Sequence, residues 1–331
     1  MTIDQVTPMP ALMLQFVDPS TVGVDPESGL IPNAMWHCVQ LLGEISVAPE
    51  RVRLVVTGDF VRSVQERLGE HPAAEDFDLQ RGSGLVAGKT MPEADGSIDV
   101  LLHSGFFSTD LNPEERASAA DLAVRTVVHE AHHVAMRQND QSYETPADQT
   151  WRDRNFTSSA DSIIDEYRAE AGASTILVAD DPSWSPLDVL NALSRELGEV
   201  TASYQEHHDV EKLAFQVETA CLIAWRAMAY IAATDVIDPE KSPVTFEVLS
   251  NPRWQRMAAH SWDKFREVLA GIQPGQAVLT QPEIAAKVEE LAEILSNWLA
   301  DLGFVWVGES FKIETWYFDD DDFMAAMADQ S

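Results

Sequence analysis

Two histidines and a glutamate near the middle of the chain have the types and spacing of a catalytic metal site. The segment His129-Glu130-Ala131-His132-His133 follows the pattern His-Glu-x-x-His. Residues four apart on a helix are offset by only about 40°, so His129 and His133 would point from one face at a single ion. Glu130 would lie roughly 100° to one side, within reach of water at that ion. The motif therefore predicts Zn²⁺ as cofactor, with His129 and His133 as ligands and Glu130 as general base.

A catalytic zinc site needs three protein ligands and one open position, so the third ligand must come from a separate element. The downstream segment Asp-Glu-Tyr-Arg-Ala-Glu-Ala at 165–171 contains the best candidates. We expect Glu166 to bind the metal. Glu170, one turn later, is expected to orient a ligand histidine through its other ring nitrogen, or to be the ligand in place of Glu166. Asp165 is a further alternative ligand, and Asp161 is a less favoured one.

Two helices should position these side chains. The first is predicted to start at Asn112-Pro113-Glu114-Glu115, which combines an N-cap residue, a proline at the first helical position and acids in the first turn. It should run to about Arg137, and the polar stretch 138–159 should form a long loop. The second helix is expected to start near 159–161 and to continue to about Val178.

The remaining elements follow from periodicity and turn residues. Residues 1–30 should be irregular, because Pro, Asp, Ser and Gly are frequent there. A hairpin is expected before the motif helix, with a turn across 92–96 that contains Asp95-Gly96. Its two strands should span 84–88 and 97–103. Further helices are predicted at 33–45, 59–68, 186–198, 199–235, 253–271 and 281–301, and further strands at 51–56, 304–307 and 311–317.

The motif residues resemble those of gluzincin metallopeptidases. HEAHH, followed by EYRAEAGA from Glu166, is most similar to the ImmA/IrrE-like family, and the resemblance spans about residues 84–178. In that group a β-hairpin precedes the HExxH helix, and a Glu-x-x-Ala pattern on the next helix supplies the third ligand. The resemblance implies peptidase chemistry and an α+β, mainly helical fold with a zincin-like core, followed by a C-terminal helical region. The expected organisation is an irregular segment 1–30, a metallopeptidase core 31–180, a mainly helical region 181–317 and an acidic flexible tail 318–331.

The charge and the apolar content of the chain restrict which partners it can bind and where in the cell it is expected. The formal net charge is −33, which repels nucleic-acid phosphates and would attract a basic protein or peptide substrate. No run approaches the roughly 18 consecutive apolar residues of a membrane span. The N-terminal segment lacks the basic start of a secretory signal, and Cys38 and Cys221 are expected to be buried thiols. We therefore expect a cytoplasmic protein without membrane or direct nucleic-acid binding.

Three functions are compatible with these patterns. The first is a zinc-dependent peptidase that uses water activated by Glu130. The second is an acidic interaction protein that keeps a zincin scaffold and binds a basic partner or mimics nucleic acid. The third is a metallohydrolase acting on a bond other than a peptide. The complete set of His129, Glu130, His133 and Glu166 favours the first, because a scaffold without activity needs no general base.

Overall fold

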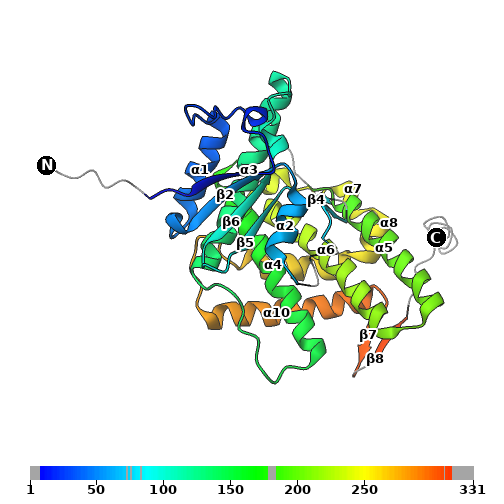
Figure 1. The fold of residues 1–331 in the computed structure, drawn as a ribbon. Coiled ribbons are helices and arrows are strands. Elements are labelled where there is room, and N and C mark those ends of the chain that lie inside the picture. The colour runs from blue at the N-terminus through cyan, green and yellow to red at the C-terminus, as the bar shows by residue number, and fades with distance from the viewer. Residues whose placement is uncertain are drawn as a thin grey trace. The chain divides into compact units, whose positions relative to one another are not determined.

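The chain is an α+β protein, mainly helical, and it forms two compact units (Figure 1). A computed structural model describes residues 8–71, 74, 77–82, 84–177, 184–308 and 310–314. Unit 1 comprises residues 1–141 together with the short segment 275–278, and unit 2 comprises 142–274 and 279–331. The metallopeptidase core predicted at 31–180 does not match this division, which falls at residue 141.

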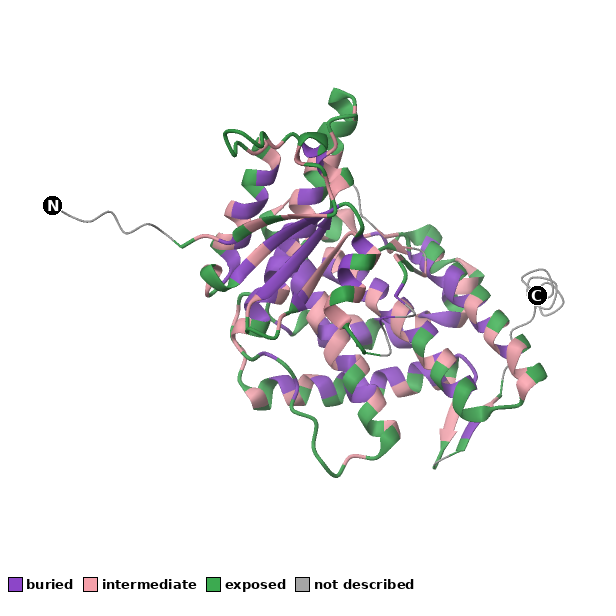
Figure 2. Ribbon diagram, viewed as in Figure 1, coloured by how far each residue is buried: buried purple, intermediate pink, exposed green. Residues whose placement is uncertain are grey.

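Unit 1 is built on a four-stranded mixed sheet with the order β1-β2-β6-β5. The strands β1, β2 and β6 are parallel, and β5 runs antiparallel to β6 at one edge. The two central strands are buried along almost their whole length, which Figure 2 shows as the interior of this unit. The bounds are β1 Ala11–Gln15, β2 Val52–Thr57, β5 Gly88–Pro92 and β6 Ile98–His103.

Helices cover both faces of this sheet. Phe60 and Val64 of α2 (Phe60–Leu68) pack on Val55 and Leu101 on one face. On the other face, α1 (Asn33–Ile45) packs against α3 (Pro113–Gln138), and α3 lies against β5 and β6. Side chains alternate between the faces of a strand, so every second residue of β5 points at α3. The edge strand and α3 therefore present side chains to each other.

A buried carboxylate, that of Asp99, holds helix α2 to the sheet of unit 1. Asp99 on β6 has no exposed surface and accepts hydrogen bonds from Arg53 Nε at 2.5 Å and from Arg67 Nη2 at 2.6 Å. Both guanidinium groups also lie within 4.0 Å of Glu93. A buried charge needs such partners, so this cluster links α2 to two neighbouring strands.

Unit 2 consists mainly of helices around α6 (Val210–Ile237). Helices α4, α5 and α9 pack against α6, and its core contains large aromatic side chains such as Trp225, Trp298 and Phe265. The hairpin β7–β8 packs on α10 and α6. The other bounds are α4 Trp151–Ile176, α5 Pro186–His207, α7 Phe246–Leu249, α8 Pro252–Met257, α9 Ala259–Ala270, α10 Gln281–Asp301, β7 Phe304–Val307 and β8 Ser310–Ile313.

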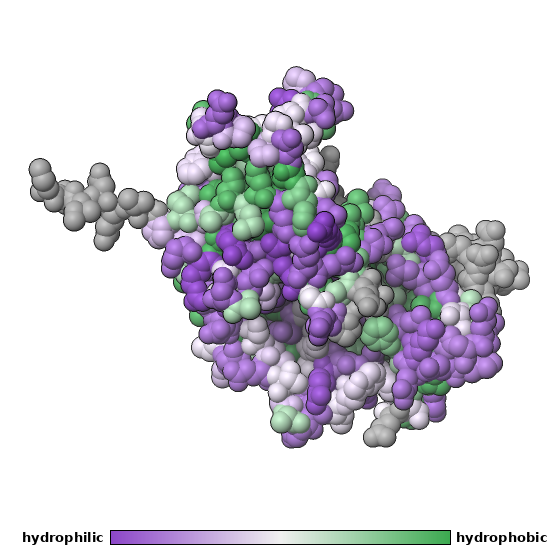
Figure 3. Space-filling model, viewed as in Figure 1, coloured by the Kyte–Doolittle hydropathy of each residue, from purple (hydrophilic) through white to green (hydrophobic). Residues whose placement is uncertain are grey.

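Among the described residues, α6 alone is long and apolar enough to cross a membrane by length and composition. More than half of its most apolar window, 56%, is buried within the structure. It is the central core helix of unit 2. The visible surface carries mostly hydrophilic side chains, with a group of hydrophobic ones near α1 of unit 1 (Figure 3).

Several predicted elements are confirmed, and the differences have local causes. Helices α1, α3 and α10 and strand β7 agree with the expected ranges to within one residue. The prediction that residues 1–30 are irregular was wrong for Ala11–Gln15, which forms a strand that pairs in parallel with β2. Parallel strands are not joined by a hairpin turn, so no turn residues next to β1 indicate in the sequence that it pairs with β2. The predicted acidic tail 318–331 lies wholly outside the described residues, and so do residues 315–317 of the strand expected at 311–317.

Four predicted boundaries were wrong. One is the boundary between α5 and α6, because α5 continues to His207 and α6 starts at Val210, whereas the break was predicted between 198 and 199. The strand that pairs with β6 is Gly88–Pro92 rather than 84–88, because the turn is a tight one that contains Gly96 at φ 78°. Helix α4 starts at Trp151 rather than 159, because the Thr150 side chain accepts a hydrogen bond from Asp153 N and caps the helix. The stretch 253–271 is broken at Ala258 into α8 and α9.

Candidate metal centre

Helix α3 places the two histidines of the motif. A capping box starts it: the Asn112 side chain accepts from Glu115 N, and Glu115 reaches back to Asn112 N. The helix is then continuous to Gln138, so the predicted four-residue spacing is realised. His129 Nε2 and His133 Nε2 lie 3.2 Å apart, with the ring planes at 72° to each other. Both rings are partly exposed.

The distance between these two nitrogens fits a shared metal ion. Two nitrogens bound to one tetrahedral zinc at about 2.05 Å would lie roughly 3.3 Å apart. The observed 3.2 Å agrees with that value. Neutral imidazoles of adjacent turns can also share one proton at this distance, so the pair alone does not identify the metal. It does show that the rings already point at one place.

Glu130 is buried beside the histidine pair, with 8% of its surface exposed. Thr90 of β5 donates its hydroxyl proton to Glu130 Oε2 at 2.8 Å, and the same hydroxyl lies 3.2 Å from the Glu130 carbonyl oxygen. Gly88, two residues earlier on the strand, also faces this side chain, because a Cβ at Gly88 would lie 3.1 Å from Glu130 Cγ. The predicted general base is therefore held against the edge strand.

Glu166 lies on α4 and is held by two residues of α6. The Tyr230 hydroxyl donates to Glu166 Oε2 at 2.6 Å, and Arg226 Nε lies 4.0 Å from Oε1. Arg226 also donates to Ser162, one turn before Glu166. Burial raises the pKa of Tyr230 well above its ordinary value, and the adjacent Glu166 carboxylate adds to the shift. The phenol thus stays a hydrogen-bond donor at neutral pH.

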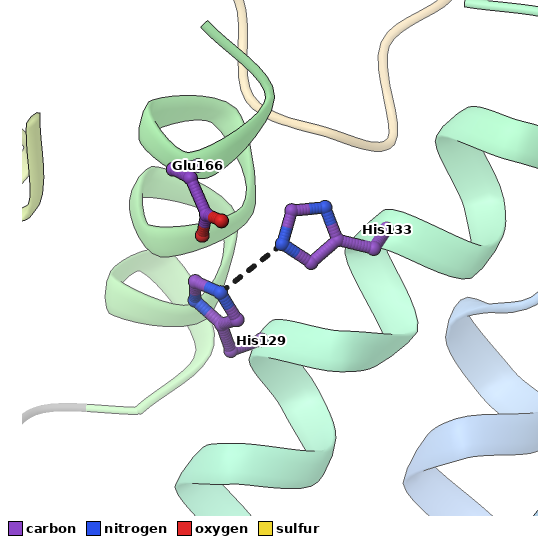
Figure 4. Close-up of side chains that lie close together, drawn as sticks. All are labelled: His129, His133 and Glu166. Atoms are coloured by element: carbon purple, nitrogen blue, oxygen red, sulfur yellow. Dashed lines mark hydrogen bonds between the residues drawn. The ribbon is translucent and has the colours of Figure 1, made fainter. Parts of the chain in front are cut away.

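The three predicted ligands form one group. One ligand atom each of His129, His133 and Glu166 lies within 4.8 Å of the others, and all three are partly exposed. Figure 4 shows the two imidazoles on successive turns of α3 and the Glu166 carboxylate turned toward them. Within the described part of the chain, no other set of His, Cys, Asp or Glu side chains meets this criterion. Two imidazoles and a carboxylate are the donor set of many catalytic zinc sites.

The alternative ligands lie outside this group. Glu170 is 7% exposed, one turn beyond Glu166, and its expected role in orienting a histidine stays a prediction. Asp161 accepts a hydrogen bond from Tyr143 N at 3.1 Å. Burial, with the nearby Asp165 carboxylate, raises the pKa of Asp161 to about 6. Cys38 and Cys221 are buried free thiols, as expected.

Four residues around the centre were not predicted from the sequence: Thr90, Gly88, Tyr230 and Arg226. Arg226 and Tyr230 are four apart on one helix, but i,i+4 polar pairs are common on helices. The first hairpin strand was predicted four residues too early, so Gly88 became its last residue and Thr90 fell outside it. A correct strand boundary would have placed both on one face of an edge strand.

Comparison with protein-family models, with curated proteins and with solved structures gave no match in any of the three cases.

Proposed function

We propose that this chain is a zinc-dependent metallohydrolase and that its reaction is peptide-bond hydrolysis. His129, His133 and Glu166 would hold the ion, and Glu130 would be the general base. The observation that carries the proposal is the convergence of the three donor side chains, with the two Nε2 atoms 3.2 Å apart. Zinc, when bound, supplies the Lewis acidity that makes water a nucleophile near neutral pH.

The buried Glu130 carboxylate suits proton transfer. It is the residue next to a ligand, so its side chain can reach water near the ion without binding the ion itself. Glu130 would take the proton of the attacking water and pass it to the leaving amine. A general base needs a fixed orientation, and Thr90 donates a hydrogen bond to one of the two Glu130 carboxylate oxygens.

The acidic surface favours basic peptide segments as substrates. A net charge of −33 attracts cationic chains over long range and raises their rate of encounter at low ionic strength. Two buried free thiols suit a reducing compartment, so we expect the protein to act in the cytoplasm. The same charge favours the second candidate function, an acidic protein that binds a basic partner without cleaving it.

Metal analysis separates these functions. Protein purified without added zinc should contain about one zinc per chain, and Glu166→Ala should lose most of it. Glu293→Ala is the matched control, because it removes an exposed carboxylate of α10 and should leave the metal content unchanged. If wild-type protein binds no zinc even when zinc is supplied, the metallohydrolase proposal fails and binding of a basic partner becomes the better function.

A further inference from the structure

Strand β5 presents two residues of one face to Glu130. Gly88 and Thr90 are two apart, so their Cα substituents point to the same side of the strand, toward α3. Thr90 donates to Glu130 Oε2 at 2.8 Å. Met91, which faces the opposite way, belongs instead to the cluster on the α2 side. The contact with Glu130 therefore follows from the register of the edge strand.

Gly88 leaves the space that the carboxylate occupies. A Cβ at this position would lie 3.3 Å from Glu130 Oε1 and 2.5 Å from Thr126 Cγ2. The second distance is far below normal contact, so a side chain at Gly88 would force Thr126 on α3 to move, and it would also crowd the Glu130 side chain. The absence of a side chain at Gly88 and the hydroxyl of Thr90 thus act on the same group.

We propose that Thr90 is a positioning residue for the general base, and that Gly88 provides the room for that orientation. The inference rests on the proposed function in so far as it concerns turnover. A hydrogen bond to Oε2 fixes the rotation of the carboxylate and directs Oε1 away from the Thr90 hydroxyl. Glu130 then offers one defined oxygen for proton transfer. Because the side chain is already ordered, less conformational entropy is lost when it reaches the geometry of proton transfer.

The contact can be tested in metal-free protein. With [δ-¹³C]glutamate labelling, the Glu130 carboxyl resonance is the one that disappears in Glu130→Gln. At constant pH it should move in Thr90→Val, which removes the hydroxyl at nearly constant volume, and stay in place in Thr90→Ser. Thr126→Val is the matched control, because the Thr126 hydroxyl donates to the Leu122 carbonyl oxygen and not to Glu130. A resonance unchanged in Thr90→Val would overturn the proposal.

The effect on turnover is tested in zinc-loaded protein with fluorescein-labelled casein as the probe. Thr90→Val should lower kcat about tenfold with little change in KM, since the lost interaction orients a group that acts in the chemical step. Thr90→Ser should recover most of the activity, and zinc content should be the same in all variants. In a Glu130→Gln background, Thr90→Val should cause no further loss, because the two residues act as one unit.

The two proposals fail in different ways. Wild-type protein that binds zinc but cleaves no casein would count against peptidase function, while the carboxyl resonance still decides the Thr90 contact. Equal losses of kcat in Thr90→Val and Thr126→Val would show a general packing defect and overturn the positioning role.

Discussion

The phenol of Tyr230 and the carboxylate of Glu166 form a hydrogen bond of 2.6 Å between two helices of unit 2. Trp184 stacks on the Tyr230 ring, with the ring centroids 5.3 Å apart, which limits the movement of the phenol. The expected third ligand therefore has its orientation set by a neighbour. Such partners of metal ligands reduce the freedom that must be lost when the metal binds.

Tyr230→Phe should weaken zinc binding about tenfold, because the ring remains and only the donor to Glu166 is lost. Competition with a chromogenic chelator measures this change directly. Tyr143→Phe is a suitable control, since the Tyr143 hydroxyl accepts a hydrogen bond from Gln149 and has no contact with Glu166. Equal zinc affinity in Tyr230→Phe and wild type would contradict the assigned role.

Glu130→Gln should retain zinc and lose at least about a hundredfold in kcat, because the amide cannot accept the proton of water. His129→Ala should instead lose the metal, because only two ligands remain. Zinc content and hydrolysis measured on the same samples separate the two effects. Substantial activity in Glu130→Gln would remove this residue from the mechanism.

The Asp161 carboxyl should make stability fall as pH rises. Its folded pKa of about 6 exceeds the ordinary value of 3.8, so the folded protein binds the proton more tightly than the unfolded chain. The stabilising contribution is complete below about pH 4 and is lost as pH rises through 6. The free energy of unfolding of Asp161→Asn should thus exceed that of wild type by about 1–2 kcal/mol at pH 8 and by little at pH 4. Urea unfolding at both pH values tests this, and an equal difference at both would be inconsistent with it.

Asp99→Ala should lower the free energy of unfolding by about 3 kcal/mol, because it leaves the mostly buried Arg67 guanidinium without its closest carboxylate. Asp95→Ala is the control. Asp95 lies 3.9 Å from Arg53 but is 67% exposed, so its loss should have an effect below about 1 kcal/mol. Chemical denaturation of both variants and of wild type measures these losses in the free energy of unfolding. Similar losses in the two variants would show that burial does not make the Asp99 ion pairs more stabilising than the exposed one of Asp95.

The sequence predicted the parts of this fold that depend on local signals. The capping residue Asn112 and the acids after it determined the start of α3, and the spacing of His129 and His133 then predicted which side chains would converge. The apolar pattern of 281–301 was likewise sufficient for α10. In each case the relevant interactions are made within a few residues, so they can be seen without knowing the fold.

Other features depend on residues far apart in the chain. Strand β1 owes its structure to pairing with β2, and nothing within Ala11–Gln15 alternates in a way that would reveal it. The partner of Glu130 is on an edge strand about forty residues earlier, and the partner of Glu166 is on a helix much later in the chain. Periodicity can place a side chain on a face of its own element, but it does not say which other element meets that face.

Unit 1 is not a continuous stretch of sequence. Gly275, from the segment 275–278, lies against His132 so closely that a Cβ there would be 2.9 Å from His132 Cβ. During synthesis, α3 would leave the ribosome long before this segment, so the motif helix reaches its final packing only after most of the protein has been translated. For the same reason, a gene fragment that ends at residue 141 would encode an incomplete unit. Recombination that exchanged the two halves of the gene would separate His132 from the segment that covers it.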